Sequence, residues 1–321
     1  MPLATLPPGP VPPQVAGDLR RLRAALDVQI PDKADGNLLI GTWNLRAFSD
    51  LTRKWQSADG DSPKRDWRAL ACIAAIVDRF DVMAIQETRR DTTALFALLA
   101  HLGGRYRVIA SDVTEGGPGN GERLAFMYDA ERIQPSGLVG EIVLPPAADS
   151  GAVQQFARTP YAAGFVRAST DFILTTVHVL WGQAPEDRIV ELTAFATWMR
   201  RWADRPQDWN RNLLVLGDFN LDRIDDPLFD AFVSTGLWPP TELNHVPRTI
   251  FADDKTHHFY DQIAWFSDPT QPNMPSMLDG ISYTRRGGGF DFLPHALRDL
   301  TKTQVSWRIS DHYPLWVEFT V

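Results

Sequence analysis

Short apolar runs alternate with stretches of helical periodicity along most of this chain. Continuous apolar runs, which are typical of buried strands, occur at residues 38–44, 81–86, 172–177 and 213–216. Further strands are expected at residues 123–128, 165–168, 259–265 and 315–321. Apolar positions three and four residues apart predict helices at residues 66–79, 91–101 and 187–203. Strands that alternate with helices early and dominate late indicate a layered α/β protein with mixed sheets and outer helices.

The N-terminal segment differs from the rest of the chain. Its first thirteen residues contain six prolines and no positive charge, which predicts an extended segment and argues against a secretory signal. Residues 17–30 are expected to form a short helix that caps the domain, with partner docking as the less favoured alternative. We therefore expect residues 1–37 to be an N-terminal extension and residues 38–321 to form one domain, since no composition break marks a second one.

Composition limits the class of protein. The 321 residues have Lys+Arg 32 against Asp+Glu 40, a net charge of −8, which argues weakly against a non-specific nucleic-acid binder. A single cysteine, Cys72, excludes an intramolecular disulfide and favours a cytoplasmic location. No uncharged apolar run reaches the length of about 18 residues that spans a bilayer, so no stable membrane association is expected.

Polar residues stand at the ends of the predicted strands. They are Asn44, Glu87, His178, Asp218, Asn220, Asp311 and His312. At such a position the core holds a side chain rigidly while it projects into an open crevice. Asp218 and Asn220 are two residues apart and would point to the same side of an extended chain. Each residue alone could be a turn former, a helix cap or a semi-buried histidine, but their combination favours a functional site.

The residue types suit one kind of chemistry. Glu87, Asp311 and Asn44 offer hard oxygen ligands, as Mg²⁺, Mn²⁺ or Ca²⁺ requires. The histidines lack the local spacing of a zinc site, and two of them with carboxylates could supply a general acid and a general base. A hard metal with such a pair suits phosphate-ester hydrolysis.

Three other common catalytic motifs are absent from the sequence. The sequence has no Walker A motif, no GxSxG elbow and no HExxH. The glycine-rich stretches at residues 116–121 and 287–289 lack the strand–turn–helix context of a dinucleotide loop and are expected to be flexible loops near the active face. The adjacent His257 and His258 are expected on a loop surface.

The chain resembles the endonuclease/exonuclease/phosphatase superfamily, and within it the deoxyribonuclease I group. The resemblance runs from about residue 38 to residue 321. It is carried by seven segments in the family's order: TWNLRAF, AIQETR, GERLAFMY, TTVHVLWG, LVLGDFNLD, FYDQIAW and SDHYPLWVEF. It implies a four-layer α/β sandwich, with two packed mixed β-sheets flanked by helices, and divalent-metal-dependent phosphodiester hydrolysis.

The resemblance also implies roles for single residues. Glu87 matches the principal metal ligand, supported by Asn44 and Asp311. Asp218 and Asn220 match the pair that positions water, metal or phosphate. His178 and His312 match the general acid and the general base, in an order left open. Glu122 matches the carboxylate that orients His178, and Asp261 matches the one that orients His312.

Two arginines point to the subgroup. Arg89 and Arg158 match positions that contact backbone phosphates in the deoxyribonuclease I group, and a guanidinium fork suits phosphate geometry. The alternative for Arg158 is an ordinary surface arginine. Asn120 departs from the pattern, because it stands where that group has a tyrosine that packs in the DNA minor groove.

The favoured function is therefore a DNA endonuclease that leaves 5′-phosphate and 3′-hydroxyl ends. The alternative is a phosphodiesterase or phosphatase of the same superfamily, acting on a lipid head group or a small phosphate ester. An inactive binding module is disfavoured because no expected catalytic position is lost, and no protein partner is implied. A bound cation would reverse the local negative potential, so the charge of −8 does not exclude DNA.

Overall fold

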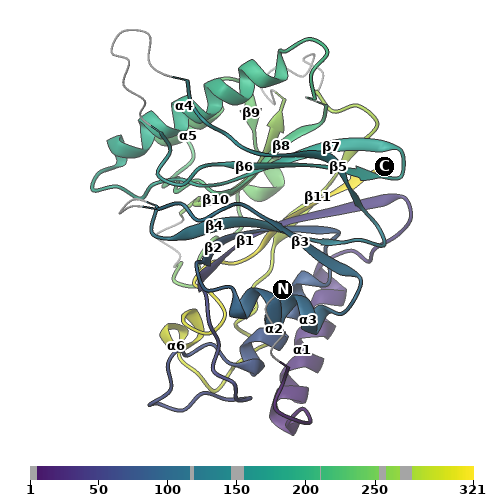
Figure 1. Ribbon diagram of the computed structural model, residues 1–321, viewed down its shortest axis with the longest axis vertical. Coiled ribbons are helices and arrows are strands. Elements are labelled where there is room, and N and C mark those ends of the chain that lie inside the picture. Colours follow the sequence, from purple (N-terminus) through teal and green to yellow (C-terminus); the bar gives the residue numbers. More distant parts are fainter. Residues whose placement is uncertain (1–5, 116–118, 146–154, 210, 253–257, 268–276) are drawn as a thin grey trace.

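The structure of the protein, a computed structural model, describes residues 6–115, 119–145, 155–209, 211–252, 258–267 and 277–321. Two six-stranded β-sheets lie face to face, and helices cover the outer face of each (Figure 1). This arrangement confirms the four-layer α/β sandwich. In the described part of the chain, no helix has both the length and the apolar character needed to cross a membrane.

The first sheet has the strand order β11-β12-β1-β2-β4-β3. Its strands are β1 (Asn37–Phe48), β2 (Val82–Arg89), β3 (Tyr106–Ala110), β4 (Glu122–Asp129), β11 (Ser282–Gly289) and β12 (Leu315–Thr320). Strands β1 and β2 run parallel, and the other neighbouring pairs are antiparallel. The helices on its outer face are α1 (Pro13–Gln29), α2 (Trp67–Val77) and α3 (Thr93–Leu102).

The second sheet has the strand order β5-β6-β7-β8-β10-β9. Its strands are β5 (Gln134–Glu141), β6 (Tyr161–Arg167), β7 (Thr170–His178), β8 (Leu213–Asp218), β9 (Leu237–Trp238) and β10 (Asp261–Phe266). Here β7 and β8 form the parallel pair. The helices on the outer face are α4 (Pro185–Ala203) and α5 (Pro227–Val233). Two short elements lie in connections: η1 (Thr241–Leu243) and α6 (Lys302–Ser306).

Strand β1 shows why the inner strands are apolar at nearly every position. Leu38 and Ile40 pack between the sheets, whereas Leu39, Trp43 and Leu45 pack under the helices of the first layer. Successive side chains of a strand point to opposite faces, so a strand covered on both faces must be apolar on both. This double coverage explains the continuous apolar runs from which the strands were predicted.

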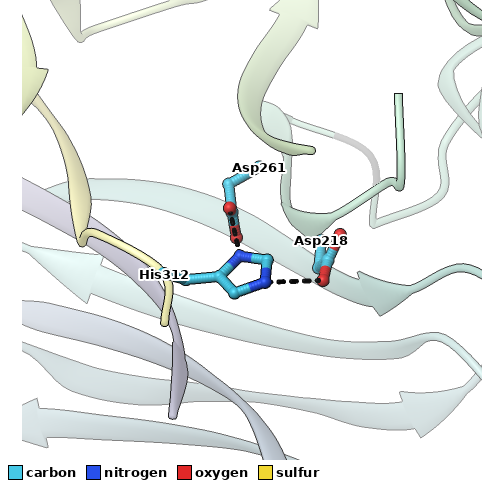
Figure 2. A group of neighbouring side chains, drawn as sticks. All are labelled: Asp218, Asp261 and His312. Carbon is cyan, nitrogen blue, oxygen red and sulfur yellow. Dashed lines mark hydrogen bonds and ion pairs between the residues drawn. The ribbon is translucent and has the colours of Figure 1, made fainter. Parts of the chain in front are cut away.

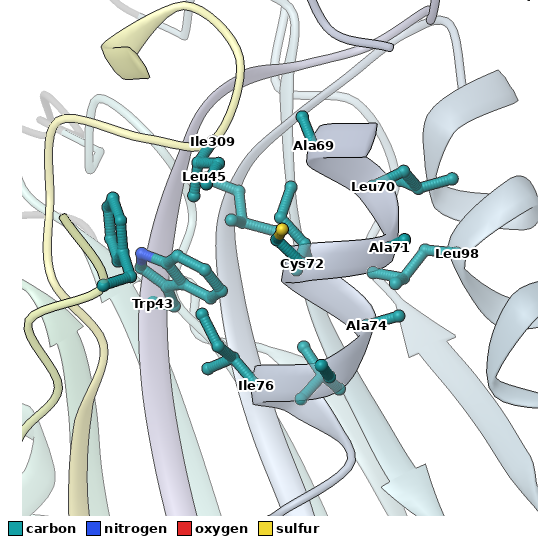
Figure 3. Packing of buried hydrophobic residues seen from close by; sticks show 14 of the residues in the cluster. Trp43, Leu45, Ala69, Leu70, Ala71, Cys72, Ala74, Ile76, Leu98 and Ile309 are labelled. Carbon is teal, nitrogen blue, oxygen red and sulfur yellow. The ribbon is translucent and has the colours of Figure 1, made fainter. Parts of the chain in front are cut away.

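The single cysteine belongs to the core. Cys72 lies on α2 and is fully buried between this helix and β1, close to Trp43 and Ile76 (Figure 3). Burial raises the pKa of its thiol above the usual range, because the thiolate would be desolvated. The thiol is therefore a packing group and not a reactive one.

One edge of the sandwich gathers the ends of many strands. The parallel pairs β1–β2 and β7–β8 finish there, and their antiparallel neighbours β4 and β10 begin there. Arg89 at the end of β2 pairs with Glu122 at the start of β4. In the other sheet Asp218 lies between His178 and Asp261. Because β1 packs on β8 across the sandwich, polar residues of both sheets meet at this edge.

The N-terminal helix is longer than expected. It begins at Pro13 and not at residue 17, because proline suits the first turn of a helix, where its missing N–H has no intrahelical role. Leu22 and Leu26 are fully buried, and the helix packs on α2. The division of the chain at residue 38 stays a prediction.

One loop prediction is wrong. Residues 287–289 form the end of β11 and pair with β12, since glycines let the two backbones approach closely: a Cβ on Gly287 would lie 3.0 Å from the carbonyl oxygen of Trp316. Residues 116–118 and His257 lie outside the described residues.

Several elements were not predicted from the apolar pattern. Strand β5 contains Pro135, Gly137 and Gly140, and its residues alternate between exposed and half-buried because it lies at a sheet edge. Strands β3, β9 and β11 and helices α5 and α6 were missed as well.

Candidate active site

The first half of the site is an imidazole–carboxylate pair at the ends of β7 and β4. Nδ1 of His178 lies 2.8 Å from Oε2 of Glu122, and both side chains are buried. Burial opposes the charged imidazolium, but the hydrogen bond to Glu122 and the charge of Asp218 outweigh it and raise the pKa of His178. This bond also orients the ring, so that Nε2 is free to exchange a proton.

Two arginines compensate the charge of Glu122. Nε of Arg158 lies 2.8 Å from Oε2 of Glu122, and Nη1 of Arg89 lies 3.4 Å from its Oε1. Burial alone would raise the pKa of Glu122, but His178 and the two arginines outweigh it and lower the pKa to about 2. Glu122 is therefore held as a carboxylate.

The second half is an equivalent pair on β10 and the segment before β12. Nδ1 of His312 lies 2.7 Å from Oδ2 of Asp261 (Figure 2). Burial opposes the imidazolium here too, but Asp261 and then Asp218 raise the pKa of His312 above its ordinary value. Trp43, from the core, donates its indole N–H to the His312 carbonyl at 2.8 Å and fixes the backbone.

Asp218 lies between the two imidazoles. Its Oδ2 is 3.7 Å from Nε2 of His178 and 3.9 Å from Nε2 of His312. Burial would raise the pKa of Asp218, but His312 and His178 outweigh it and lower the pKa. Two oriented imidazoles thus face one ionised carboxylate from opposite sheets.

An oxygen-rich group adjoins Asp218. The Asn44 amide donates to Oδ2 of Asp218 at 3.0 Å and to Oε1 of Glu87 at 3.1 Å, and the Ala47 N–H donates to Oε2 of Glu87 at 2.8 Å. Among the described residues, the buried Oδ1 of Asn44 has no hydrogen-bond partner. An orphaned amide oxygen beside a carboxylate fits a hard cation, so the residues present fit the expected metal.

Asp311, the third predicted ligand, is more exposed. Its Oδ2 is paired with Nη1 of Arg46 at 3.1 Å, and its side chain is 26% exposed. Oxygen and nitrogen atoms of Asp218, Asp261 and His312 also lie within 4.8 Å of one another, which makes a second possible cation position. Because Asp261 and His312 already bond each other, we interpret that trio as suited to proton transfer.

Sequence comparison identifies the family. A family model described as the Endonuclease/Exonuclease/phosphatase family matches residues 41–312. The chain belongs to this family. Its members are hydrolytic enzymes of the phosphoesterase type and depend on divalent metal ions.

Individual relatives are more distant. A curated protein named Deoxyribonuclease, from Thioalkalivibrio sp. (strain K90mix), is 26% identical over 308 residues, covering 92% of this chain and 74% of the relative. The solved structure of a mannosyl-6-phosphatase from Bacteroides thetaiotaomicron VPI-5482 has a TM-score of 0.59 at 18% identity. The match covers 88% of this chain and 100% of the phosphatase chain. D. rerio TDP2 complexed with single strand DNA product has a TM-score of 0.55 at 14% identity, covering 89% and 99%. These two structures show the fold alone.

In this family member the GDFN segment is shaped by its glycine. Gly217 has φ +138, and a Cβ there would lie 2.2 Å from the carbonyl oxygen of Val177 on β7. Asn220 then turns into a left-handed conformation, with φ +52, and donates its amide to the Val179 carbonyl at 2.7 Å. The two residues would point to the same side only if the chain were extended, and it leaves the extended conformation after Asp218.

The arginine predictions have different outcomes. The side chain of Arg158 is 11% exposed and bound to Glu122, so the surface alternative is wrong. Arg89 donates to the Asn120 carbonyl at 2.6 Å and lies 3.4 Å from Glu87. The phosphate contacts of both arginines stay predictions, as do the roles of the other site residues.

Several residues that support the backbone of the site were not predicted from the sequence. Ser310 donates to the Asn44 carbonyl at 2.5 Å and accepts from the His312 N–H, and its place in the SDHYP segment was the available signal. Glu191 on α4 accepts from the backbone N–H groups of Ala157 and Leu180, next to Arg158 and His178. Nothing local in the sequence marks Glu191, because its partners come from distant loops.

Arg65 was missed for the same reason. It is buried and donates to the carbonyls of Arg46, Ala47, Arg308 and Ile309. Two of these carbonyls lie in the segment that contains Ala47, whose N–H donates to Glu87. The other two lie in the segment that leads to His312. Arg65 thus ties together the backbones on both sides of the expected metal position.

Proposed function

We propose that this protein is a divalent-metal-dependent DNA endonuclease that leaves 5′-phosphate and 3′-hydroxyl ends. The observation that carries the proposal is the convergence of two oriented imidazoles on Asp218, 3.7 and 3.9 Å away, beside Asn44 and Glu87. Hydrolysis of a phosphodiester needs one group that takes a proton from water and another that gives one to the leaving oxygen. This arrangement provides one candidate from each sheet.

His178 and His312 would perform the two proton transfers through their Nε2 atoms. Glu122 and Asp261 hold each ring and stabilise its charged form. Asp218 would hold the attacking water between them, and the left-handed turn at Asn220 fixes Asp218 through its backbone N–H at 3.0 Å.

Glu87 and Asn44 would hold the metal, with Asp311 beside them. A bound cation neutralises charge on the phosphoryl oxygens. We propose Mg²⁺, with Mn²⁺ or Ca²⁺ as alternatives, because all three prefer oxygen ligands. Removal of the metal should stop the reaction without unfolding the chain, since the core is formed by apolar layers.

A nucleic-acid substrate, DNA in particular, is supported by two observations. The curated relative that aligns with 92% of this chain is named Deoxyribonuclease. Arg89 and Arg158 lie beside Glu122 at the site, and we propose that they contact phosphates of the substrate backbone. A cytoplasmic location is part of the same proposal and rests on the single cysteine.

A second candidate is hydrolysis of a small phosphate ester or lipid head group. The name of one fold neighbour, a mannosyl-6-phosphatase, is the reason to test it. Such a reaction would use the same imidazoles and carboxylates.

One experiment separates them. The protein is incubated with supercoiled plasmid and Mg²⁺, with and without chelator, and in parallel with a sugar phosphate and a phosphoinositide. We expect nicking that the chelator abolishes and that Glu87→Ala lacks while circular dichroism shows the fold intact. Hydrolysis of the small esters without plasmid nicking would overturn the proposal.

A further inference from the structure

Two exposed tryptophans lie beside the site, in the connections that follow β7 and α6. Trp181 follows the end of β7 and is 53% exposed, and Trp307 follows α6 and is 49% exposed. Large aromatic side chains usually bury most of their surface. Exposed rings at a catalytic edge therefore need an explanation.

Trp181 is connected to His312 by ring contacts. Its centroid lies 5.7 Å from that of Tyr260, which lies 5.8 Å from the ring of His312. The guanidinium of Arg188 lies 4.7 Å from the Trp181 ring. Arg188 in turn donates to the Asn220 carbonyl at 2.6 Å. The ring is thus held against the GDFN segment.

Trp307 is likewise held by an arginine that lies against its ring. The guanidinium of Arg46 lies 3.9 Å from its ring centroid, and Arg46 is bound to Asp311 at 3.1 Å and to Ser306 at 3.0 Å. Asp311 is the residue before His312. Each tryptophan therefore rests on an arginine that is itself fixed to the catalytic segment.

These arginines supply rigidity more than free positive charge. Arg46 is paired with Asp311, and Arg188 with Asp222 at 3.1 Å. Binding that relies on duplex phosphates needs uncompensated basic groups, which this pairing reduces. A fixed, exposed ring is suited to stack on an unpaired base, since every base has a π-face.

We propose that Trp181 and Trp307 are stacking platforms for two bases, one on each side of the cleaved bond, and that the substrate is single-stranded or locally unpaired nucleic acid. This inference rests on the proposed function. Bases inside a duplex are already stacked on their neighbours and cannot reach both rings without unpairing. Stacking on both rings would give a single-strand nuclease affinity and would position the bond between the two bases.

The test compares one bond in three contexts. End-labelled oligonucleotides present the same phosphodiester in a single strand, in a duplex, and in a single strand with abasic sites on both sides, and cleavage at that bond is resolved on a sequencing gel. The proteins are the wild type, Trp181→Ala, Trp307→Ala and the control Trp209→Ala. Trp209 is 54% exposed but follows α4, whose 19 residues, about 28 Å long, separate it from Trp181.

We expect the wild type to cleave the single strand faster than the duplex. Trp181→Ala and Trp307→Ala should each lower kcat/KM on the strand with bases by about 5- to 150-fold, the range for loss of one stacked base. On the abasic strand they should match the wild type, and Trp181→Phe should recover most of the loss. Trp209→Ala should behave as the wild type on every strand.

Three outcomes overturn the inference. One is an unchanged kcat/KM in both variants, the second is an equal loss on abasic and normal strands, and the third is faster cleavage of the duplex. If the wild type cleaves no nucleic acid and hydrolyses only small esters, the proposed function itself has failed. The two failures are therefore distinguishable.

Discussion

Nε2 of His178 lies 3.7 Å from Oδ2 of Asp218, although the two residues are forty positions apart in the sequence. They are register partners at the ends of the parallel strands β7 and β8. The pairing of β7 with β8 fixes this distance, and the packing of the two sheets brings His312 to the other side of the same carboxylate. The active-site geometry is thus a property of strand register. Changes to the backbone at this edge should affect activity more than stability.

Glu122→Gln should change the pH dependence of stability and activity. Glu122 has a lowered pKa, so its contribution is complete above its unfolded value of 4.5 and is lost as pH falls toward about 2. His178 has a raised pKa, so its contribution is complete below 6.5 and is lost as pH rises through its folded value. The stability lost in the variant should therefore be largest between pH 4.5 and 6.5.

Urea unfolding at a series of pH values measures this loss. The variant should also move the limb of the pH–rate profile that belongs to His178 to lower pH, because only the charge of Asp218 would then oppose burial and Arg158 at the imidazole. The control is Glu131→Gln at an exposed position. A pH-independent loss of stability in Glu122→Gln would show that the pair is not ionised.

Arg65→Lys should loosen the metal position. Lysine keeps the charge but cannot reach four carbonyls with one fork, so at least one buried acceptor loses its partner, at a cost of about 1–3 kcal/mol. Because Ala47 donates to Glu87, we expect weaker Mn²⁺ binding, measured by titration calorimetry, together with lower unfolding free energy.

Arg90→Lys is the matched control for Arg65→Lys. Arg90 is exposed and paired with Glu115 at 2.7 Å, so Arg90→Lys should change stability by less than about 0.5 kcal/mol and leave Mn²⁺ binding unchanged. Equal Mn²⁺ affinities for Arg65→Lys and the wild type would remove Arg65 from the positioning role.

Gly217→Ala should displace Asp218. The new Cβ would meet the Val177 carbonyl oxygen at 2.2 Å in a conformation that L residues rarely adopt, so β8 must move away from β7. Strain of this kind costs about 1–3 kcal/mol. We expect catalysis to fall by more than tenfold in protein that still folds, as single-turnover rates and thermal unfolding would show.

Gly36→Ala is the comparison, because no atom lies within 4 Å of a Cβ placed there. It should leave both quantities nearly unchanged. If Gly217→Ala retained the wild-type rate, the close approach of β8 to β7 would not determine the position of Asp218.

The apolar pattern predicted a layered α/β protein with mixed sheets, and the resemblance carried by short segments added the four-layer sandwich, because both depend on local signals. A strand covered on two faces is apolar throughout, and the GDFN and SDHYP segments carry their chemistry within a few residues. Edge strand β5 was missed because Pro135 and its glycines remove that signal. The spacing of Asp218 and Asn220 did not reveal the positive φ of Asn220, at which the chain turns away from the strand direction.

The supporting residues were beyond sequence reasoning for a different reason. Arg65 acts on backbone carbonyls of segments about twenty and about 245 positions away, so its partners become visible only when the chain is folded. Ring contacts such as those of Trp181 with Tyr260 have the same origin.

The central claim is that His178 and His312 act as one catalytic unit on Asp218. The most direct measurement is the single-turnover rate of DNA cleavage by His178→Ala, His312→Ala and the double variant, each with its fold checked by circular dichroism. We expect each single variant to lose about 10²- to 10⁴-fold and the double variant to lose little more, because groups that act together are not additive. A folded single variant with a rate near that of the wild type would contradict the account.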